Sequence, residues 1–407
     1  MDATAARIVI VGAGQAGATL AETLRALGHR GPLTLVGAEP VAPYQRPPLS
    51  KKYLLGEIGP DRLALKPDSF WTEQGVETIL GARAAALDRG ARVLRLADGR
   101  ALPFDLLALA TGARPRRLPA AIGGELPGVH VLRDQADADA LAAALRPGGR
   151  MLVVGGGYIG LEAAAVAAAR GMAVTLVEAA PRILGRVAPA ETADFFRALH
   201  ARHGVRIVAG ASLAAFDERA GRLAGAVLAD GSRIEADVAV VGVGVAPEDA
   251  LAGDAGLRIE NGVAVDAACR TADPAIFAAG DCASFPWRGQ RVRLESVQNA
   301  IDMARAAARA MMGEAVTYDP TPWFWSDQFD VKLQIAGLGA GRDRVVVRPG
   351  AREGALSVWS FAAGRLLAVD AMNDARAYMT AKRWLEEGRS PDPDRLADPA
   401  ADLRDLA

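Results

Sequence analysis

Two glycine-rich turns, one near the start of the chain and one near residue 155, constrain the fold more than any other feature. The second turn has the sequence GGGYIG at residues 155–160. It follows an apolar stretch, 151–154, and precedes an alanine-rich stretch, 161–170. A further apolar stretch then ends at Glu178. A strand, a glycine turn, a helix, a strand and an acid, in this order, form the dinucleotide-binding pattern.

Each glycine has a separate task in this pattern. Gly155 makes the tight turn, Gly157 lets backbone amides approach a pyrophosphate, and Gly160 lets helix and strand pack closely. The helix N-terminus then offers the anion unpaired N–H groups and a partial positive charge. Glu178 predicts NADH, because a carboxylate binds the ribose hydroxyls of NAD and repels the additional phosphate of NADP. Arg182 leaves NADP open, since an arginine there could pair with that phosphate.

The same pattern opens the chain. GAGQAG at residues 12–17 follows the apolar strand 7–11, and a predicted helix runs from the turn to about Leu27. The predicted strand 33–36 then leads to Glu39. A single match also occurs where a glycine turn merely ends a strand, but two complete matches predict two bound dinucleotides. Two dinucleotides indicate two cofactors that exchange electrons.

Length and composition narrow the class of protein. A chain of 407 residues is expected to form two or three domains, and 51% hydrophobic residues with 44 glycines suit a well-buried α/β protein. Lys and Arg number 47 against 48 Asp and Glu, with no long basic run, so the sequence argues against a nucleic-acid partner. The first strand leaves no room for a signal peptide, and no apolar run is long enough for a membrane span. We expect a cytoplasmic protein that does not bind membranes.

Cysteines and histidines offer little further chemistry. Cys269 and Cys282 form no CxxC or CxxxxC pair and lie away from both glycine turns, which indicates buried structural thiols. His200 and His203 share a helix face, but no third ligand is near in sequence, so no metal site is predicted.

The segment YQRPPLSK at residues 44–51 is a candidate for the flavin site. Two prolines stiffen it, and Ser50 is predicted to cap a helix beginning at Lys51. Arg46 and Lys51 lie just past the first ribose-binding strand, where a cation can stabilise negative charge on a reduced flavin. A capped loop without a further role is the alternative.

Other strand ends also suit a flavin. The buried strand 105–110 ends at Thr111-Gly112, where little side chain blocks a cofactor, and the strand from residue 275 ends at Gly280-Asp281, whose carboxylate suits ribitol hydroxyls. After the segment 294–299, a predicted helix runs to about Met312, and its N-terminus would favour a reduced flavin anion. Glu162 suits equally the dipole of its own helix and a role near the nicotinamide.

The order of these elements predicts three domains. Residues 1–113 and 245–320 form a discontinuous FAD-binding domain, which includes a small antiparallel layer within 76–104. Residues 114–244 form the NAD-binding domain. Residues 321–407 form a C-terminal α+β domain with antiparallel strands within 332–369 and a helix at 373–387.

The motifs GAGQAG, YQRPPLSK, ATGARPR, GGGYIGLE, AAGDCA, ESVQNA and WFWSDQ, in this order, resemble those of the NADH-dependent ferredoxin reductases of bacterial oxygenase systems. The resemblance covers essentially the whole chain, and WFWSDQ is its most specific motif. It implies a glutathione-reductase-like fold of class α/β, with two Rossmann-like nucleotide-binding domains and a C-terminal α+β domain. It also implies FAD and NADH as cofactors, and an enzyme of class EC 1.18.1 that reduces a [2Fe-2S] ferredoxin serving a P450 or Rieske-type oxygenase.

The motifs and the resemblance together give the candidate residues. Lys51 and Glu162 form the implied catalytic pair beside flavin N5. The candidates for binding FAD are Gly12, Gly14, Ala16, Gly17, Glu39, Arg46, Lys51, Ala84, Thr111, Gly112, Arg133, Gly280, Asp281, Val297 and Trp325. The candidates for binding NAD are Gly155, Gly157, Ile159, Gly160, Glu162, Glu178 and Gly242.

The ferredoxin partner is expected near Trp325, a candidate to cover the flavin. Such ferredoxins are usually acidic, so docking on this nearly neutral chain needs a local basic patch. Arg305 and Arg309, on one helix face, and Lys332 are candidate contacts; solvated arginines without a partner are the alternative. We expect a monomer or weak dimer.

The alternative functions are reductases with another electron acceptor, or a flavoprotein that is not an enzyme. A rubredoxin reductase would differ only in its iron protein. A peroxide or coenzyme A disulfide reductase would need a reactive cysteine in the loop 40–51, which contains none. A DNA-binding flavoprotein like apoptosis-inducing factor would need a strongly basic surface, which the charge balance does not supply.

Overall fold

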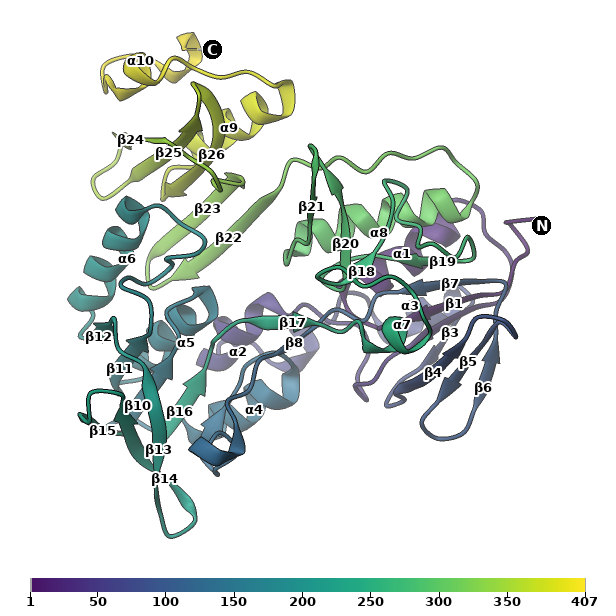
Figure 1. Cartoon of the computed structure of the whole chain (residues 1–407), viewed down its shortest axis with the longest axis horizontal. Coiled ribbons are helices and arrows are strands. Elements are labelled where there is room, and N and C mark those ends of the chain that lie inside the picture. The colour runs from purple at the N-terminus through teal and green to yellow at the C-terminus, as the bar shows by residue number, and fades with distance from the viewer. Residues whose placement is uncertain (1, 407) are drawn as a thin grey trace. The chain divides into compact units, whose positions relative to one another are not determined.

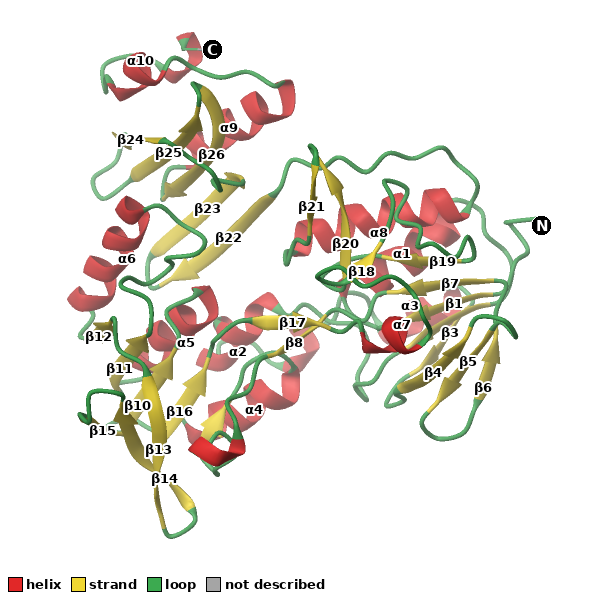
Figure 2. Ribbon diagram, viewed as in Figure 1, coloured by secondary structure: helices red, strands yellow, loops and turns green. Residues whose placement is uncertain are grey.

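The computed structural model of the chain describes residues 2–406 and contains two compact units, each assembled from segments distant in sequence (Figure 1). The first unit combines the chain up to Gln45 with Pro60–Arg114 and Val245–Pro320. The second combines Arg46–Gly59, Pro115–Gly244 and the chain from Thr321 onward. Both units mix helices with sheets, which confirms the predicted α/β class (Figure 2).

The first unit is centred on a parallel sheet with the strand order β19-β7-β1-β2-β3. Its strands are β1 (Ile8–Val11), β2 (Leu33–Val36), β3 (Val76–Ile79), β7 (Leu106–Leu109) and β19 (Ile276–Ala278). The prediction for β3 was wrong, because this strand pairs parallel with β2 and does not join an antiparallel layer. As an edge strand it exposes Glu77 and Thr78, so it lacks the continuous apolar run of central parallel strands.

Smaller sheets and helices complete the first unit. The predicted antiparallel layer is formed by β4 (Ala84–Asp88), β5 (Val93–Leu96) and β6 (Ala101–Pro103). A further sheet contains β18 (Val263–Ala264), β20 (Ala283–Trp287) and β21 (Gln290–Val292). The helices are α1 (Gln15–Ala26), α3 (Asp68–Glu73), α7 (Ala250–Asp254) and α8 (Val297–Met311), with the 3-10 turn η2 (Pro60–Arg62). Helices α1 and α8 pack against each other.

The chain passes to the second unit along β8 (Ala113–Pro115) and returns along β17 (Val245–Pro247). In the second unit, a parallel sheet has the order β12-β11-β10-β16-β9. Its strands are β9 (Val129–His130), β10 (Arg150–Val154), β11 (Ala173–Glu178), β12 (Arg206–Ala209) and β16 (Val238–Val241). An antiparallel sheet adds β13 (Leu213–Arg219), β14 (Arg222–Leu228) and β15 (Arg233–Glu235).

Helices of the second unit carry several candidate residues. They are α2 (Lys52–Leu55), α4 (Gln135–Ala144), α5 (Tyr158–Ala169) and α6 (Ala190–Arg202), with the 3-10 turns η1 (Pro47–Ser50) and η3 (Ala120–Ile122). Helix α5 is buried from residue 160 to residue 167, as its alanine-rich sequence indicates.

The C-terminal part of the second unit is an antiparallel sheet with the order β22-β23-β26-β25-β24. Its strands are β22 (Trp323–Gln328), β23 (Val331–Gly337), β24 (Arg344–Pro349), β25 (Leu356–Ala362) and β26 (Arg365–Met372). The strands predicted within 332–369 are confirmed, whereas β22 was not predicted. Helix α9 (Ala375–Glu387) begins two residues later than predicted, because the side chain of Asp374 accepts a hydrogen bond from the Ala377 amide and caps it.

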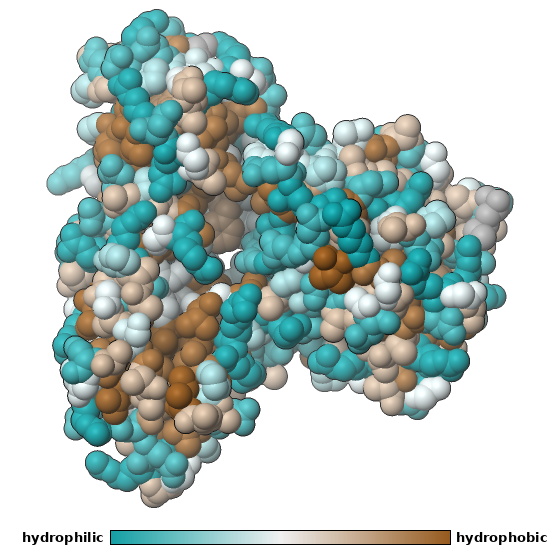
Figure 3. Space-filling model, in the orientation of Figure 1, coloured by the Kyte–Doolittle hydropathy of each residue, from teal (hydrophilic) through white to brown (hydrophobic). Residues whose placement is uncertain are grey.

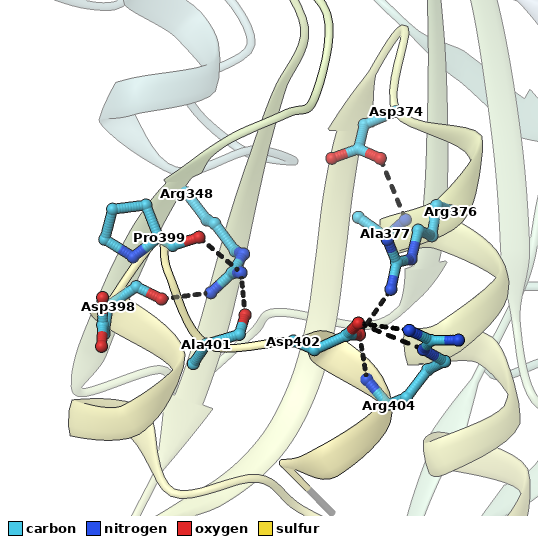
Figure 4. Close-up of polar contacts among 9 residues, drawn as sticks. All are labelled: Arg348, Asp374, Arg376, Ala377, Asp398, Pro399, Ala401, Asp402 and Arg404. Atoms are coloured by element: carbon cyan, nitrogen blue, oxygen red, sulfur yellow. Dashed lines mark hydrogen bonds and ion pairs between the residues drawn. The ribbon is translucent and has the colours of Figure 1, made fainter.

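The tail beyond α9 contains α10 (Pro393–Ala397) and η4 (Leu403–Asp405), and Arg348 on β24 binds it (Figure 4). This buried guanidinium donates hydrogen bonds to the backbone carbonyl oxygens of Leu396, Asp398, Pro399 and Ala401. Nearby, Asp402 pairs with Arg376 of α9 and with Arg404. The tail is therefore part of the fold of this sheet.

The surface carries mixed polarity. On the face drawn in Figure 3, hydrophilic residues predominate and hydrophobic residues gather in patches. Exposed large hydrophobic side chains are those of Ile159, Val187, Ile259, Val347 and Met379. Within residues 2–406, no helix has both the length and the apolar character needed to cross a bilayer.

Candidate functional site

The first glycine turn has the geometry of a nucleotide cradle. Gly12 has a φ of +113°, and a Cβ atom built on it would lie 2.1 Å from the Ala110 carbonyl oxygen. A Cβ atom on Gly17 would lie 1.9 Å from the Gly12 carbonyl oxygen, so any side chain there would push α1 away from the strand end. Gly14 has open space at its Cβ position and caps α1 without a side-chain hydrogen bond. The N-terminal amides of α1 therefore fit a pyrophosphate.

The second glycine turn repeats this geometry in the second unit. Gly155 has a φ of +107°, and its Cβ position lies 2.4 Å from the carbonyl oxygen of Gly242, which follows β16. The Cβ position of Gly160 lies 2.1 Å from the Gly155 carbonyl oxygen. Gly157 has open space and caps α5 without a side-chain hydrogen bond. Ile159, in the first turn of α5, is 43% exposed, which suits contact with a ligand.

Glu178 lies at the second glycine turn. Its Oε2 accepts a hydrogen bond from the Gly156 amide at 2.6 Å, and its Oε1 accepts one from the Ala180 amide at 2.7 Å. Arg182 donates from Nη1 to the Ala188 carbonyl oxygen at 3.0 Å. The carboxylate is thus fixed beside the N-terminus of α5, and the Arg182 guanidinium is engaged with the loop that follows.

Most candidate flavin residues lie in the first unit; they are Gly12, Gly14, Ala16, Gly17, Glu39, Ala84, Thr111, Gly112, Gly280, Asp281 and Val297. Gly280 has a φ of +83°, and its Cβ position lies 3.0 Å from the Ala16 Cβ atom, so these two candidates meet. Glu39 accepts a hydrogen bond from the Tyr44 hydroxyl at 2.6 Å. The Thr111 hydroxyl donates to the Glu248 carbonyl oxygen at 2.5 Å.

The remaining flavin candidates belong to the second unit; they are Arg46, Lys51, Arg133 and Trp325. The Arg46 guanidinium donates from Nη1 to the Arg133 carbonyl oxygen at 3.0 Å, so these two candidates are adjacent. Trp325 is half-buried on β22, and its ring centroid lies 5.7 Å from that of Trp323.

Glu162 on α5 is the centre of a buried polar cluster in the second unit. Only 2% of its side chain is exposed, yet its carboxylate has several donors. The Lys51 Nζ lies 2.7 Å from Oε2, and the Ser50 hydroxyl donates to the same oxygen at 2.5 Å. The Ser326 hydroxyl donates to Oε1 at 2.6 Å. The pairing of Lys51 with Glu162 that the resemblance implied is present, and it gives this buried carboxylate the counter-ion it requires.

The predicted cap at Ser50 was wrong. Ser50 ends η1, α2 begins at Lys52, and its N-cap residue is Lys51, which makes no side-chain cap. The Ser50 hydroxyl instead donates to Glu162, a residue 112 positions away. A hydrogen bond to a buried carboxylate is stronger than one to an exposed amide, so the distant partner is favoured over the local one.

The contribution of β22 was also missed. Ser326 and Gln328 are fully buried and lie on one face of this strand, because they are two positions apart. Phe324 shares that face, and its ring centroid lies 4.8 Å from that of Tyr158 on α5. The available signal was the aromatic-rich segment WFWSDQ itself, whose three aromatic residues are followed directly by three polar ones.

The prediction of buried cysteines is confirmed, and both candidate histidines lie against aromatic side chains. Cys269 and Cys282 are free and buried, and burial raises the pKa of the Cys269 thiol to about 12. His203 stacks on Phe329, and His200 is buried. Among the described residues, no group of three or more His, Cys, Asp or Glu side chains is arranged to hold a metal ion.

Comparisons with known proteins agree with this architecture. Residues 6–304 match the family described as pyridine nucleotide-disulphide oxidoreductase, and residues 323–407 match the reductase C-terminal domain. Rhodocoxin reductase of Rhodococcus erythropolis is 42% identical over 399 residues, which cover 98% of this chain and 93% of that protein. A rubredoxin-NAD(+) reductase of Pseudomonas putida is 40% identical over 368 residues, covering 90% and 95%.

A solved structure is similar over nearly the whole chain. The putidaredoxin reductase in its covalent complex with putidaredoxin matches with a TM-score of 0.95 and 37% identity, covering 98% of this chain and 97% of that one. The predicted glutathione-reductase-like fold and the resemblance are thereby confirmed. The chain belongs to the pyridine nucleotide-disulphide oxidoreductase family, among its reductases with the additional C-terminal domain.

Proposed function

We propose that this protein is an FAD-dependent oxidoreductase that passes electrons from NADH to a [2Fe-2S] ferredoxin, which then serves a P450 or Rieske-type oxygenase. The presence of two glycine cradles in one chain, together with the buried Lys51–Glu162 pair, carries the proposal. The names of the similar reductases support the choice of acceptor. NADH loses two electrons and a proton, and each of two ferredoxins takes up one electron.

The two cradles would hold the two dinucleotides. The amides at the start of α1 would bind the FAD pyrophosphate, with Glu39 accepting hydrogen bonds from the adenosine ribose. The amides at the start of α5 would bind the NADH pyrophosphate, with Glu178 at the ribose. Arg182 is engaged with the carbonyl of Ala188, which supports NADH over NADPH. FAD, when bound, supplies the change from two-electron to one-electron transfer.

Lys51 and Glu162 would act as one unit at the reacting rings. The Lys51 ammonium would stabilise negative charge that develops when a hydride arrives. Glu162 would hold that ammonium in place through the 2.7 Å ion pair. Arg46, Arg133 and Trp325 are proposed as further flavin contacts.

Thiol chemistry has no support in the chain. Cys269 and Cys282 are buried, and burial raises the pKa of each thiol. A thiolate is the reactive form, so neither cysteine suits disulfide exchange. Electrons from FAD are therefore proposed to leave the protein directly.

The ferredoxin surface is proposed near Trp325, with Arg305, Arg309 and Lys332 as contacts. Arg305 and Arg309 lie on exposed positions of α8, and Lys332 is exposed on β23. Arg309 is partly neutralised by Glu314 at 2.6 Å, whereas Arg305 lies 3.9 Å from Asp302. We propose a cytoplasmic enzyme, where NADH is available.

The deciding experiment starts from purified protein. We expect bound FAD that loses its absorbance when NADH is added without oxygen, and that regains it when an oxidised [2Fe-2S] ferredoxin is supplied. Rubredoxin is tested in parallel as the rival acceptor. Colourless protein, or flavin that NADH does not reduce, contradicts the proposal. A higher kcat/KM with rubredoxin than with ferredoxin would change the proposed acceptor and leave the rest of the proposal standing.

A further inference from the structure

A line of buried hydrogen bonds connects α6 to Glu162 on α5. It passes through β22, which runs beside α5 and α6 (Figure 2). His200 Nε2 lies 2.9 Å from Gln328 Oε1, and Gln328 Nε2 lies 3.1 Å from the Ser326 hydroxyl oxygen. That hydroxyl lies 2.6 Å from Glu162 Oε1. His200, Gln328 and Ser326 have no exposed surface, so water does not compete for these groups.

The chemistry of the groups fixes the direction of this line. Glu162 is paired with Lys51, and an ionised carboxylate only accepts hydrogen bonds, so Ser326 must donate its single proton to it. The Ser326 oxygen can then only accept, which orients the Gln328 amide with its NH₂ group toward Ser326. The Gln328 carbonyl oxygen must in turn accept from His200, which requires a proton on Nε2.

The surroundings of His200 support a neutral ring with that one proton. Its Nδ1 atom has no hydrogen-bond partner, and its ring meets Phe329 edge-on at 5.1 Å. Burial lowers the pKa of His200 below its usual value; the hydrogen bond with Gln328 opposes this shift, and neighbouring His203 adds to it. A bare, buried Nδ1 and a donating Nε2 describe one tautomer only.

We propose that His200, Gln328 and Ser326 are positioning residues for hydride transfer, which together hold the Glu162 carboxylate in the rotamer that presents Oε2 to Lys51. The inference rests on the proposed role of the Lys51–Glu162 pair. Ser326 anchors Oε1, Gln328 fixes the proton of Ser326, and His200 fixes the amide of Gln328. The C-terminal sheet thereby acts on the nicotinamide site without touching a cofactor.

The first test measures flavin reduction by NADH in the holoenzyme by stopped flow. Ser326→Ala and Gln328→Leu are each expected to lower the limiting rate about tenfold, because a misplaced catalytic group loses its alignment. Ser326→Thr, which keeps the hydroxyl, is expected to retain most of the rate. Because the hydrogen bonds act in series, the double variant Ser326→Ala/Gln328→Leu should be no slower than Ser326→Ala alone. If the two changes were independent packing defects, their effects on the rate would multiply.

Ser357→Ala is the matched control. Ser357 is a fully buried serine on β25 of the same sheet, and its hydroxyl bonds Arg348 and Trp359 instead. Its removal tests general loosening of the sheet, and the limiting rate should stay within twofold of the wild type. An equal loss of rate in Ser357→Ala and Ser326→Ala contradicts a specific positioning role.

The second test needs no turnover. The sequence has only four histidines, so nitrogen NMR of labelled oxidised protein can assign the His200 ring, with His200→Phe identifying its signals. We expect a neutral ring protonated on Nε2, and a changed Nε2 signal in Gln328→Leu. A ring protonated on Nδ1, or on both nitrogens, at neutral pH overturns the proposal even where a variant fails to fold.

Glu162→Gln distinguishes a failure of the positioning residues from a failure of the proposed function. If Glu162→Gln slows flavin reduction while Ser326→Ala and Gln328→Leu do not, the positioning line is wrong and the proposed function stands. If Glu162→Gln leaves the rate unchanged, the proposed role of Glu162 itself fails.

Discussion

The Nζ atom of Lys51 lies 2.7 Å from Oε2 of Glu162, although 111 positions separate these residues in the chain. The pair joins the segment that follows the first nucleotide-binding pattern to the helix of the second. Only 2% of the Glu162 side chain and 16% of the Lys51 side chain are exposed. Each charge therefore depends on the other for its stability in the folded protein.

Replacing Lys51 tests the pair directly. We expect Lys51→Met to slow flavin reduction by NADH about 100-fold with FAD still bound, because the positive charge that faces the developing negative charge is lost. Stopped-flow absorbance measures the rate. Lys52→Met is the control, since Lys52 is the exposed neighbour. Equal rates for wild type and Lys51→Met would remove the role assigned to Lys51.

Glu178 is expected to set the preference for NADH. Its carboxylate lies at the second glycine turn, where it would bind ribose hydroxyls and repel a phosphate. Glu178→Gln should reduce the ratio of kcat/KM for NADH to that for NADPH by about tenfold, since a hydrogen bond to a charged group contributes about 1.5–3 kcal/mol. Steady-state kinetics with both nucleotides measure the ratio. A wild-type enzyme that prefers NADPH contradicts the assignment.

Asp370 makes stability depend on pH. It is buried on β26 and accepts a hydrogen bond from the Thr192 hydroxyl at 2.8 Å. Burial raises the pKa of Asp370 from 3.8 to about 6. A raised pKa in the folded state means that the stability contributed by the protonated form is complete below pH 3.8 and is lost as the pH rises through about 6.

Asp370→Asn should remove this dependence. The raised pKa of Asp370 makes the wild type less stable at high pH by about 3 kcal/mol at most. The melting temperature of the variant minus that of the wild type should therefore be larger at pH 8 than at pH 5. Thermal melts at both pH values measure the difference. A difference in melting temperature that is the same at both pH values would show that Asp370 does not titrate in this window.

Arg348 is expected to hold the C-terminal tail. Arg348→Met removes hydrogen bonds to carbonyl oxygens between residues 396 and 401 and leaves some of them buried without a donor. We expect a loss of about 2–4 kcal/mol and faster proteolysis of the tail. Arg404→Met, at an exposed position of the same tail, is the control and should change the melting temperature little. A tail that resists protease equally in both variants contradicts the role.

Arg305 and Arg309 test the ferredoxin surface. Changing both to Glu should raise the KM for ferredoxin several-fold at low salt, and added salt should reduce the difference by screening. The double variant Arg219→Glu/Arg222→Glu, at exposed positions of β13 and β14, is the control with the same change in net charge. An unchanged ferredoxin KM at low salt would move the docking surface elsewhere.

Local patterns explain which parts of the fold the sequence could predict. Both glycine turns follow from residues within one short segment, so Gly12, Gly155 and their helices were predicted correctly. The edge strand β3 was misplaced because its exposed Glu77 and Thr78 imitate an antiparallel strand.

The site depends on contacts that no local pattern contains. Ser50 and Ser326 bond the same carboxylate from 112 and 164 positions away in the chain. Each serine has an ordinary local interpretation, as a cap for Ser50 and as part of a motif for Ser326. The pairing of Lys51 with Glu162 was expected only through the resemblance to a family. Long-range packing decides these partners, and it became visible only in the folded chain.

The strand β22 places Ser326 and Gln328 on one face and Trp325 on the other. It lies at the edge of its sheet, and within residues 2–406 it pairs with β23 alone. The alternation of side chains along β22, its parity, is therefore critical. One residue inserted or deleted within 323–328 would turn the Trp325 indole inward and the Ser326 hydroxyl outward. Length changes in the loop 338–343, between β23 and β24, leave that parity intact. Engineers who vary this domain should treat the length of β22 as fixed and the length of the loop 338–343 as free.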